Sequence, residues 1–483
     1  MDNSFIKKFL KGLASASFGT AATVAFHFFS IMVMVRYTTI DDFGLYMLLL
    51  AVVHGLRVFS GLGLDLTLVK FTSATENATA RQHTFATIFV TRLVVALAIG
   101  ALIVLLGQLI LPAFDARLLN VLFYLPVLCV LTSIKEMIFY YFQGLYLFKK
   151  YAIASVASAA FKFGLIFLFL SHTSLGIVQL IEIELIGLVG CLALQAVLLP
   201  AGTFKRLLPS AAALKKSLRF GVPLYLNNLL TFFYERSSVF IIGYLLDPIS
   251  IALYEIAAKI PDGFQRLFSS FIAVYFPSLS GLLSEGKSKA AERIMNKSLI
   301  LLSAGVMLLA LAAFLFKDQI IVLLFSEKYL EASLAFTVLM VNFQIIIVSY
   351  TLGYSLVSAG FASLPVKVNS VATVINVIAN FALIPIYGFI GAVYASLVMN
   401  ASALILNYFY LRRYGMLPAM LRYFSPLAVA VALMLIFQFA GLQSLAAKLA
   451  FLSLYSLSCF AFEKELRGLF QFGARLPRFS IHR

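Results

Sequence analysis

Long uninterrupted runs of apolar residues, separated by short polar segments, dominate this chain. A helix needs about 20 apolar residues to cross a bilayer, and the runs are continuous rather than alternating, unlike membrane β-strands. Fourteen runs reach roughly this length, at about 14–35, 43–63, 85–110, 118–141, 151–171, 176–200, 220–245, 250–277, 298–316, 332–358, 365–386, 388–411, 421–440 and 444–462. The pattern predicts an all-α polytopic membrane protein. We expect its linkers at 64–84, 201–219 and 278–297, with a tail at 463–483.

Composition excludes several classes of protein. Of 483 residues, 62% are hydrophobic and 12% charged, whereas soluble chains hold about 25% charged residues. A water-soluble enzyme and a single-pass anchored domain are therefore excluded. The chain contains no phosphate-binding loop, dinucleotide turn, zinc-protease motif or cysteine cluster. We predict a non-enzymatic transporter without cofactor or metal, in which Cys129, Cys191 and Cys459 are reduced and structural.

The net charge of +17 indicates topology rather than nucleic-acid binding. Cytoplasmic loops of membrane proteins are enriched in Lys and Arg. If the N-terminus is cytoplasmic, most basic residues fall in cytoplasmic segments, including the tail. The sequence therefore predicts an inner-membrane, multi-pass protein with both termini in the cytoplasm.

The chain resembles itself at an ungapped offset of 208 residues. Lys7 and Lys8 align with Lys215 and Lys216. A polar stripe also repeats: Thr20, Thr23, His27 and Ser30 align with Asn228, Thr231, Glu235 and Ser238. Because the offset covers six spans, an even number, the repeat is parallel. We predict a six-helix lobe at 1–205, a second at 206–415, and at 416–483 two extra helices with a basic cytoplasmic tail.

Basic side chains inside spans are candidate substrate ligands, since intramembrane charges are costly and usually functional. Lys162 falls near the middle of its span and would bind an anionic group; the alternatives are a structural pair with an acid on a neighbouring helix, or a neutral lysine. Arg92 would bind phosphate, or else extend to the interface. Lys135, Glu136, Arg57 and His54 are expected near the cytoplasmic interface, and Glu182 and Glu184 near water on the outer side.

Other polar residues predict sugar binding and ion coupling. His27 and Glu235 occupy equivalent repeat positions and would carry a proton or sodium ion; alternatively they are buried and hydrogen-bonded. Asn228, Asn376 and Asn380 are candidate substrate-binding residues. The stripe that contains the last two has an alternative role as contacts between helices. Glu255 and Lys259 are spaced for a pair within one helix.

Several strings resemble the polysaccharide transport family of the multidrug/oligosaccharidyl-lipid/polysaccharide flippase superfamily. They include RYTTIDDFGLY (36–46), SGLGLDLTLVKF (60–71), FQGLYLFKKY (142–151) and NVIANFALIPIYGFIGAVYAS (376–396). The resemblance covers about residues 5–415. It implies a twelve-helix core of two lobes around a cationic cavity, which alternates between the two membrane sides.

The same resemblance implies the substrate and the partners. The substrate would be a polyprenyl-pyrophosphate-linked oligosaccharide, moved to the outer leaflet for O-antigen or exopolysaccharide assembly. Its diphosphate would meet Arg92 or Lys162, and its tail would stay among membrane lipids. A glycan polymerase and export machinery are further implied partners. Ser237 and Ser238 stand where the family often has an acidic residue.

Three alternative functions remain open from the sequence. A peptidoglycan lipid II flippase also has fourteen spans, but its expected Arg-rich first helix is not evident here. A drug or cation antiporter would have a more acidic cavity. A membrane glycan polymerase or ligase would carry a long outer loop with Arg and His, whereas the longest outer loop expected here, 317–331, lacks His.

Overall fold

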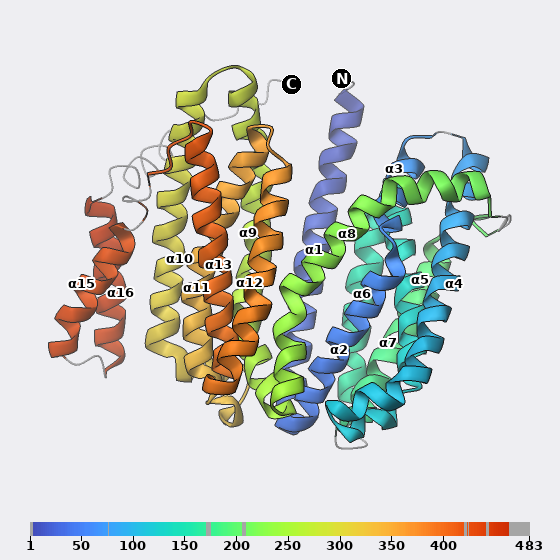
Figure 1. The fold of residues 1–483 in the computed structure, drawn as a ribbon, viewed down its shortest axis with the longest axis horizontal. Helices are drawn as coiled ribbons and strands as arrows, with labels where there is room; N and C mark the ends of the chain where they lie inside the picture. Colours follow the sequence, from blue (N-terminus) through green and yellow to red (C-terminus); the bar gives the residue numbers. More distant parts are fainter. Residues whose placement is uncertain are drawn as a thin grey trace. The chain divides into compact units, whose positions relative to one another are not determined.

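A computed structural model describes residues 3–462 except 76, 171–174, 205–208, 420–422, 424 and 441–443. The predicted basic tail, residues 463–483, lies outside the described residues. The described chain is almost entirely helical (Figure 1). Contacts divide it into two compact units: unit 1 comprises Met1–Glu255 with Leu324–Lys328, and unit 2 comprises Ile256–Leu323 with Tyr329–Arg483.

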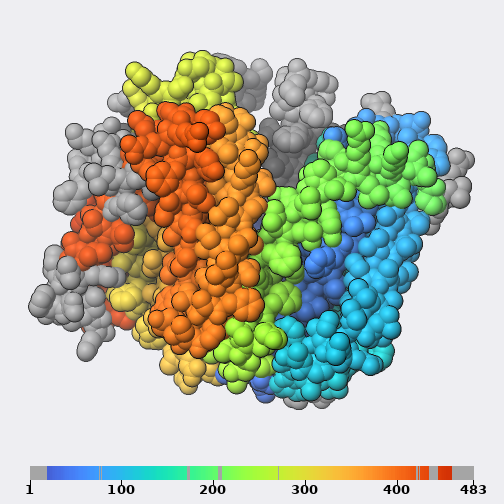
Figure 2. Space-filling model, viewed as in Figure 1, coloured from blue at the N-terminus to red at the C-terminus, as the bar shows by residue number. Residues whose placement is uncertain are grey.

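Unit 1 contains eight α-helices, the start of a ninth and two short 3-10 helices. They are α1 (Asn3–Tyr37), α2 (Ile40–Gly61), α3 (Leu64–Ser73), α4 (Ala78–Ile110), η1 (Leu111–Ala113), η2 (Ala116–Val121), α5 (Tyr124–Gly144), α6 (Phe148–Leu170), α7 (Ile177–Leu198), α8 (Ala211–Leu245) and the first turns of α9 (Pro248–Ser284). Helix α8 packs against α2 and α3, and Figure 2 shows its green surface against the blue of the earlier helices. Unit 1 thus holds a helix that the sequence assigns to the second lobe.

Unit 2 contains the rest of α9 and the helices that follow. These are α10 (Ser288–Leu324, its last residue in unit 1), α11 (Ala332–Ser358), α12 (Ser363–Tyr387), α13 (Phe389–Arg413), α15 (Ser425–Ala440) and α16 (Leu445–Phe462). The short helix η3 (Glu327–Tyr329) has its first two residues in unit 1 and its last in unit 2. Helix α13 packs against both α11 and α12. Helix α16 reaches α10 through the Tyr455 hydroxyl, which donates to the Ala304 carbonyl oxygen at 3.3 Å.

A glycine turn separates α2 from α3 and fixes the position of α8. Leu62 and Gly63 have positive φ values of 49° and 69°, a conformation that glycine adopts without steric cost. A Cβ atom on Gly63 would lie 2.0 Å from the carbonyl oxygen of Gly221 in α8. The turn therefore requires glycine both for its backbone conformation and for the close approach of α8. It also places Asp65 in the first turn of α3.

The helix bounds repeat at the offset found in the sequence. Helix α1 runs from Asn3 to Tyr37, and α8 runs from Ala211 to Leu245, so both ends are 208 residues apart. Helices α2 and α9 begin at Ile40 and Pro248, again 208 residues apart. The compact units follow contacts rather than this repeat, so the lobe boundaries at 205/206 and 415/416 remain predictions.

The structure supports a multi-pass membrane protein but not the count of fourteen spans. Ten described helices are long and apolar enough to cross a membrane, or eleven if the bent helix Pro248–Ser284 is one span. The predicted linker 64–84 was partly wrong, because it contains α3. The linker 278–297 was also placed too broadly: α9 continues to Ser284 and α10 begins at Ser288. The last turns of α9 and the first turns of α10 extend these helices beyond the apolar runs.

All three cysteines are buried, and Cys129 and Cys191 are free thiols, as predicted. Cys129 is in α5, Cys191 in α7 and Cys459 in α16.

Candidate functional site

A buried ion pair joins α3 to α4 in unit 1. The Arg92 guanidinium donates from Nη1 to Asp65 Oδ1. Arg92 is only 1% exposed, and its Nε and Nη2 atoms have no hydrogen-bond partner among the described residues. Arg92, predicted to bind phosphate or to extend to the interface, instead lies inside the unit against a carboxylate. Because a charge at such a site is costly without a partner, this pair fixes the α2–α3 turn against α4.

A second group of charges, which we call the Arg57 cluster, consists of His54, Arg57, Lys135 and Glu136. Arg57 Nη1 and Lys135 Nζ each lie 3.5 Å from a different Glu136 oxygen. Arg57 Nη2 lies 3.2 Å from His54 Nε2. The cluster joins α2 to α5, and the nearby Ser60 and Ser133 hydroxyls, 2.9 Å apart, add another contact between these helices.

The Arg57 cluster and the Arg92 pair form one electrostatic environment. Arg57 and Arg92 both interact electrostatically with Asp65 and with Glu136. Three strongly basic groups, Arg57, Arg92 and Lys135, therefore share two carboxylates. Arg57 retains 32% side-chain exposure, so a basic group within this environment remains accessible.

A third group, the Lys162 triad, consists of Tyr46, Lys162 and Glu184. Lys162 Nζ and the Tyr46 hydroxyl both donate to Glu184 Oε1, and Lys162 Nζ lies 3.3 Å from the Tyr46 oxygen. The pair of Lys162 with an acid on a neighbouring helix was one of the two predicted alternatives. The expectation that Glu184 lies near water was wrong: its side chain is 16% exposed and ion-paired.

The structure brings two predicted site residues close to the same carboxylate. His27 of α1 interacts electrostatically with Glu184, which is also the partner of Lys162. His27 itself is exposed. The sequence predicted roles for His27 and Lys162 separately. The structure shows that both interact with Glu184.

Helix α8 supplies a further ion pair and an aromatic wall. Arg236 Nη1 donates to Glu255 Oε1 at 3.2 Å. The buried ring of Phe232 lies 5.7 Å from the ring of His54. Asn228 is half-buried and Glu235 exposed on the same helix. Glu255 thus has a partner on α8.

The predicted asparagines of unit 2 lie in α12. Asn380 Nδ2 donates to Asn376 Oδ1 and to the Asn376 carbonyl oxygen, both at 2.9 Å. Both asparagines are buried. Their mutual contact within one helix is a structural one, and their role in substrate binding remains a prediction.

Sequence analysis missed Asp65 and underestimated Glu136 and Glu184. Asp65 follows the GLG turn within a segment taken as a linker, so nothing in the hydropathy pattern marks it as buried. A usable signal was the need of each intramembrane cation for an acid. The described residues contain no group of three or more His, Cys, Asp or Glu side chains that could hold a metal ion.

An ion-paired loop lies outside the spans of unit 1. Arg117 Nη2 lies 2.7 Å from Asp115 Oδ2, and Nη1 contacts Asp41. Hydrogen bonds from Arg117 lower the pKa of the Asp115 carboxyl, and those from Arg117 to Asp115 and Asp41 raise the pKa of the guanidinium. The turn between α1 and α2 is fixed separately, by a hydrogen bond from Lys328 Nζ to the Thr38 carbonyl oxygen.

Solved transporters share this fold. The lipid II flippase MurJ in an inward closed conformation has a TM-score of 0.75 at 13% identity, covering 94% of this chain and 99% of that one. An inward-facing multidrug resistance MATE family transporter of the MOP superfamily has a TM-score of 0.66 at 15% identity, covering 80% and 94%. At these identities the similarity concerns the fold alone.

Sequence comparison gives the family. The probable low-salt glycan biosynthesis flippase Agl15 of Haloferax volcanii is 28% identical over 185 residues, or 37% of this chain. The match spans 38% of the length of that relative. The sequence profile described as polysaccharide biosynthesis protein matches residues 33–334. Because this range is more than half of the 483 residues, the chain belongs to the polysaccharide biosynthesis protein family.

Proposed function

We propose that this protein moves polyprenyl-diphosphate-linked oligosaccharides from the cytoplasmic to the outer leaflet for surface polysaccharide assembly. The protein acts in the cytoplasmic membrane, with both termini in the cytoplasm. It works by alternating access, and it hands its product to glycan polymerase and export machinery. Family membership and the relation to a glycan flippase support this reaction class.

The observation that carries the proposal is the surplus of basic groups around the Arg57 cluster. Arg92 pairs with Asp65, and Arg57 and Lys135 both pair with Glu136, so one basic charge in this environment is not balanced by these carboxylates. A diphosphate would supply the missing negative charge, and a guanidinium binds its oxygens in a bidentate geometry. A ligand that is itself a cation would add to the imbalance, so the cluster favours an anionic lipid over a cationic drug.

Arg57 is the accessible ligand in this proposal, and Arg92 is a positioning residue. Arg92 is buried against Asp65 and holds the α2–α3 turn. Arg57 retains 32% side-chain exposure and lies on α2 just before that turn. The predicted roles of Arg92 and Lys162 as direct ligands are thus replaced in our proposal by Arg57.

A deletion strain tests the reaction. We expect polyprenyl-linked oligosaccharide to accumulate and surface polysaccharide to be lost, with both restored by the wild-type gene. Unchanged glycan with altered drug susceptibility would replace the proposal with an antiporter. Short, unpolymerised surface glycan would point to a polymerase instead.

The role of the Arg57 cluster is tested by complementation with Arg57→Ala. We expect transport to fall at least tenfold, the effect of losing about 1.4 kcal/mol of ligand stabilisation. Lys287→Ala is a matched control, because Lys287 forms an exposed pair with Glu285 in unit 2. Full transport by Arg57→Ala at wild-type protein level would contradict the proposed role.

We further propose that the Lys162 triad and His27 couple transport to an ion gradient. Glu184 accepts hydrogen bonds from Lys162 and Tyr46 and interacts electrostatically with His27. Protonation of Glu184 or of His27 would therefore change the interaction between Glu184 and Lys162. The Glu184→Gln variant should bind lipid normally but lose the dependence of transport on an imposed proton or sodium gradient. Gradient-dependent transport in this variant would contradict the coupling role. Glu235 remains the equivalent candidate on α8.

A further inference from the structure

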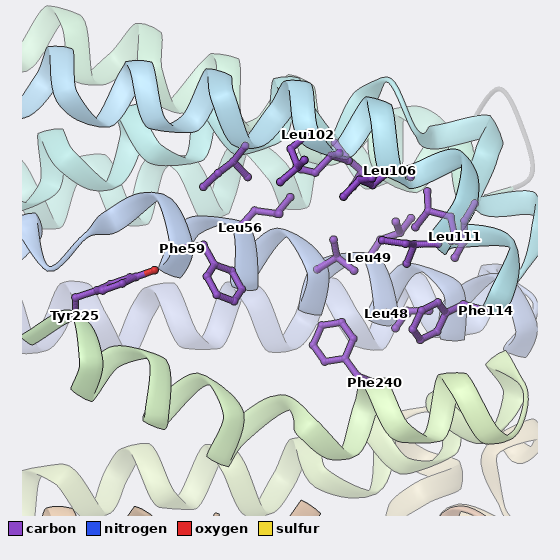
Figure 3. A pocket seen from close by; sticks show the side chains of 17 residues that line it. Leu48, Leu49, Leu56, Phe59, Leu102, Leu106, Leu111, Phe114, Tyr225 and Phe240 are labelled. Carbon is purple, nitrogen blue, oxygen red and sulfur yellow. The ribbon is translucent and has the colours of Figure 1, made fainter. Parts of the chain in front are cut away.

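An elongated apolar groove runs along unit 1 between α2, α4 and α8. Its volume is about 570 Å³. In Figure 3, Tyr225 lies at one end and Phe114 at the other, with Leu56, Phe59 and Phe240 between them. Leu102 and Leu106 of α4 point into the groove from the opposite side.

The dimensions of the groove match one leaflet of a membrane. Its lining residues extend from Leu48 to Phe59 on α2 and from Ile99 to Ile110 on α4. At a rise of 1.5 Å per residue, each stretch is about 16 Å long. The hydrocarbon core of a bilayer is about 30 Å thick, so the groove accommodates a chain that crosses about half of it.

The side chains that line the groove favour a hydrocarbon ligand. All lining side chains are Leu, Val, Ile, Phe or Gly except Tyr225, whose hydroxyl is the one polar side-chain group of the groove. A sugar or phosphate in this groove would lose its hydrogen bonds to water without replacement. Leu102 and Leu106 are 52% and 42% exposed, so a lipid chain can enter from the side.

A single aromatic ring lies close to both the groove and the Arg57 cluster. The Phe232 ring lies 6.0 Å from the rings of Phe59 and of Phe240, both of which line the groove. It also lies 5.7 Å from the ring of His54 in the cluster. The hydrocarbon site and the basic site are therefore neighbours, and Phe232 is close to residues of both.

We propose that this groove holds the isoprenoid tail of the transported lipid while its diphosphate is bound at the Arg57 cluster. This inference rests on the proposed function. The adjacency of an apolar chain site and a basic site suits an amphiphile with one hydrocarbon chain and an anionic head. Phe232 is the residue around which the lipid passes from one site to the other.

Photocrosslinking tests the tail site. The probe is a polyprenyl diphosphate with a diazirine in its chain, added to the full-length protein in lipid nanodiscs. We expect labelled peptides from α2, α4 and α8. The double variant Leu102→Trp/Leu106→Trp fills the groove and should lower labelling about tenfold, since each buried methylene contributes roughly fourfold to affinity.

Matched controls use neighbouring leucines on the same helix. Leu105 and Leu109 are 75% and 79% exposed and do not line the groove, so Leu105→Trp/Leu109→Trp should label normally. Equal loss in both double variants would overturn the site. A photoreactive phospholipid that labels the groove without competition from polyprenyl diphosphate would also overturn the inference, because bulk lipid would then be the occupant.

Transport assays separate this inference from the proposed function. If wild-type protein flips the lipid but labels only outside the groove, the tail site is wrong and the function stands. If it neither labels nor flips, the proposed function fails as well. Labelling by polyprenyl diphosphate that is unaffected by Arg57→Ala would overturn the link between the tail groove and the Arg57 cluster.

Discussion

The two units stabilise polar groups within their helices in different ways. Unit 1 uses charged pairs: Arg92 with Asp65, Arg57 with Glu136, and Lys162 with Glu184. Unit 2 uses neutral groups, such as Asn342 with Ser396. In unit 2, the ion pair Lys287–Glu285 is exposed and the ion pair Lys317–Asp318 is half-buried.

This difference separates groups suited to function from groups suited to packing. Hydrogen bonds between neutral side chains on two helices carry no charge over the whole physiological pH range and contribute modest stability. A buried ion pair stabilises little beyond an apolar pair of the same shape, yet its charge can attract a ligand or change with protonation. We therefore propose that the charged groups of unit 1 attract the substrate and couple transport to an ion gradient. The hydrogen bonds between neutral groups in unit 2 would instead hold its helices together.

The largest effect is expected from breaking the most buried pair. Asp65→Ala leaves the Arg92 charge without its carboxylate inside unit 1, which should lower the free energy of unfolding by about 3–5 kcal/mol. Thermal unfolding in nanodiscs measures this. A loss below about 1 kcal/mol would mean that Arg92 finds another partner or water, and that the pair does not hold the α2–α3 turn.

A smaller effect is expected at the Lys162 triad, which is less buried. Glu184→Gln should cost about 2 kcal/mol, because Lys162 keeps its charge but loses the carboxylate. The double variant Lys162→Met/Glu184→Leu should recover most of that loss, since an apolar pair replaces a desolvated ion pair at little cost. A double variant no more stable than the single one would show that the triad matters through shape rather than charge. Both are measured as unfolding free energies under one lipid condition.

Substitutions among Asn342, Ser396 and Asn400 of unit 2, which we call the amide ladder, should cost less stability than breaking the ion pairs of unit 1. Asn400 Nδ2 donates to Asn342 Oδ1 at 3.2 Å, and Asn342 Nδ2 donates to Ser396 Oγ at 2.9 Å. Asn400→Ala should cost about 0.6–1.7 kcal/mol, the range for interhelical hydrogen bonds in membranes, with transport intact. A transport defect at normal stability would show that the ladder contributes to function and would remove the distinction between the units.

The smallest effect is expected from acid on the loop outside the spans. Hydrogen bonds from Arg117 lower the pKa of the Asp115 carboxyl below its ordinary value of 3.8. Stability from this pair is therefore present above about pH 4 and lost as the pH falls through the lower folded pKa. Arg117→Ala should slightly reduce the unfolding temperature at pH 6 and less at acidic pH. An equal reduction at every pH would mean that packing, not charge, explains the effect.

The sequence was informative where local pattern decides the structure. Apolar runs predicted the helices, and the offset of 208 residues reappears in the bounds of α1 and α8. It was less informative where polar residues form helix, as in α3, because hydropathy does not distinguish a polar helix from a linker. The count of fourteen spans stays a prediction, because ten or eleven described helices meet the length and hydropathy of a span.

Sequence by itself determined the membrane class, the internal repeat and the positions of Lys162 and Arg92 within spans. Tertiary structure alone decided which acid each cation meets: Asp65 for Arg92, Glu184 for Lys162. It also placed Arg57 with Glu136, and Phe232 close to both the groove and the cluster. Hydropathy is read over neighbouring residues, whereas a partner on another helix depends on how the helices rotate and pack. The low-polarity interior then makes that partner, rather than the cation alone, the determinant of the site.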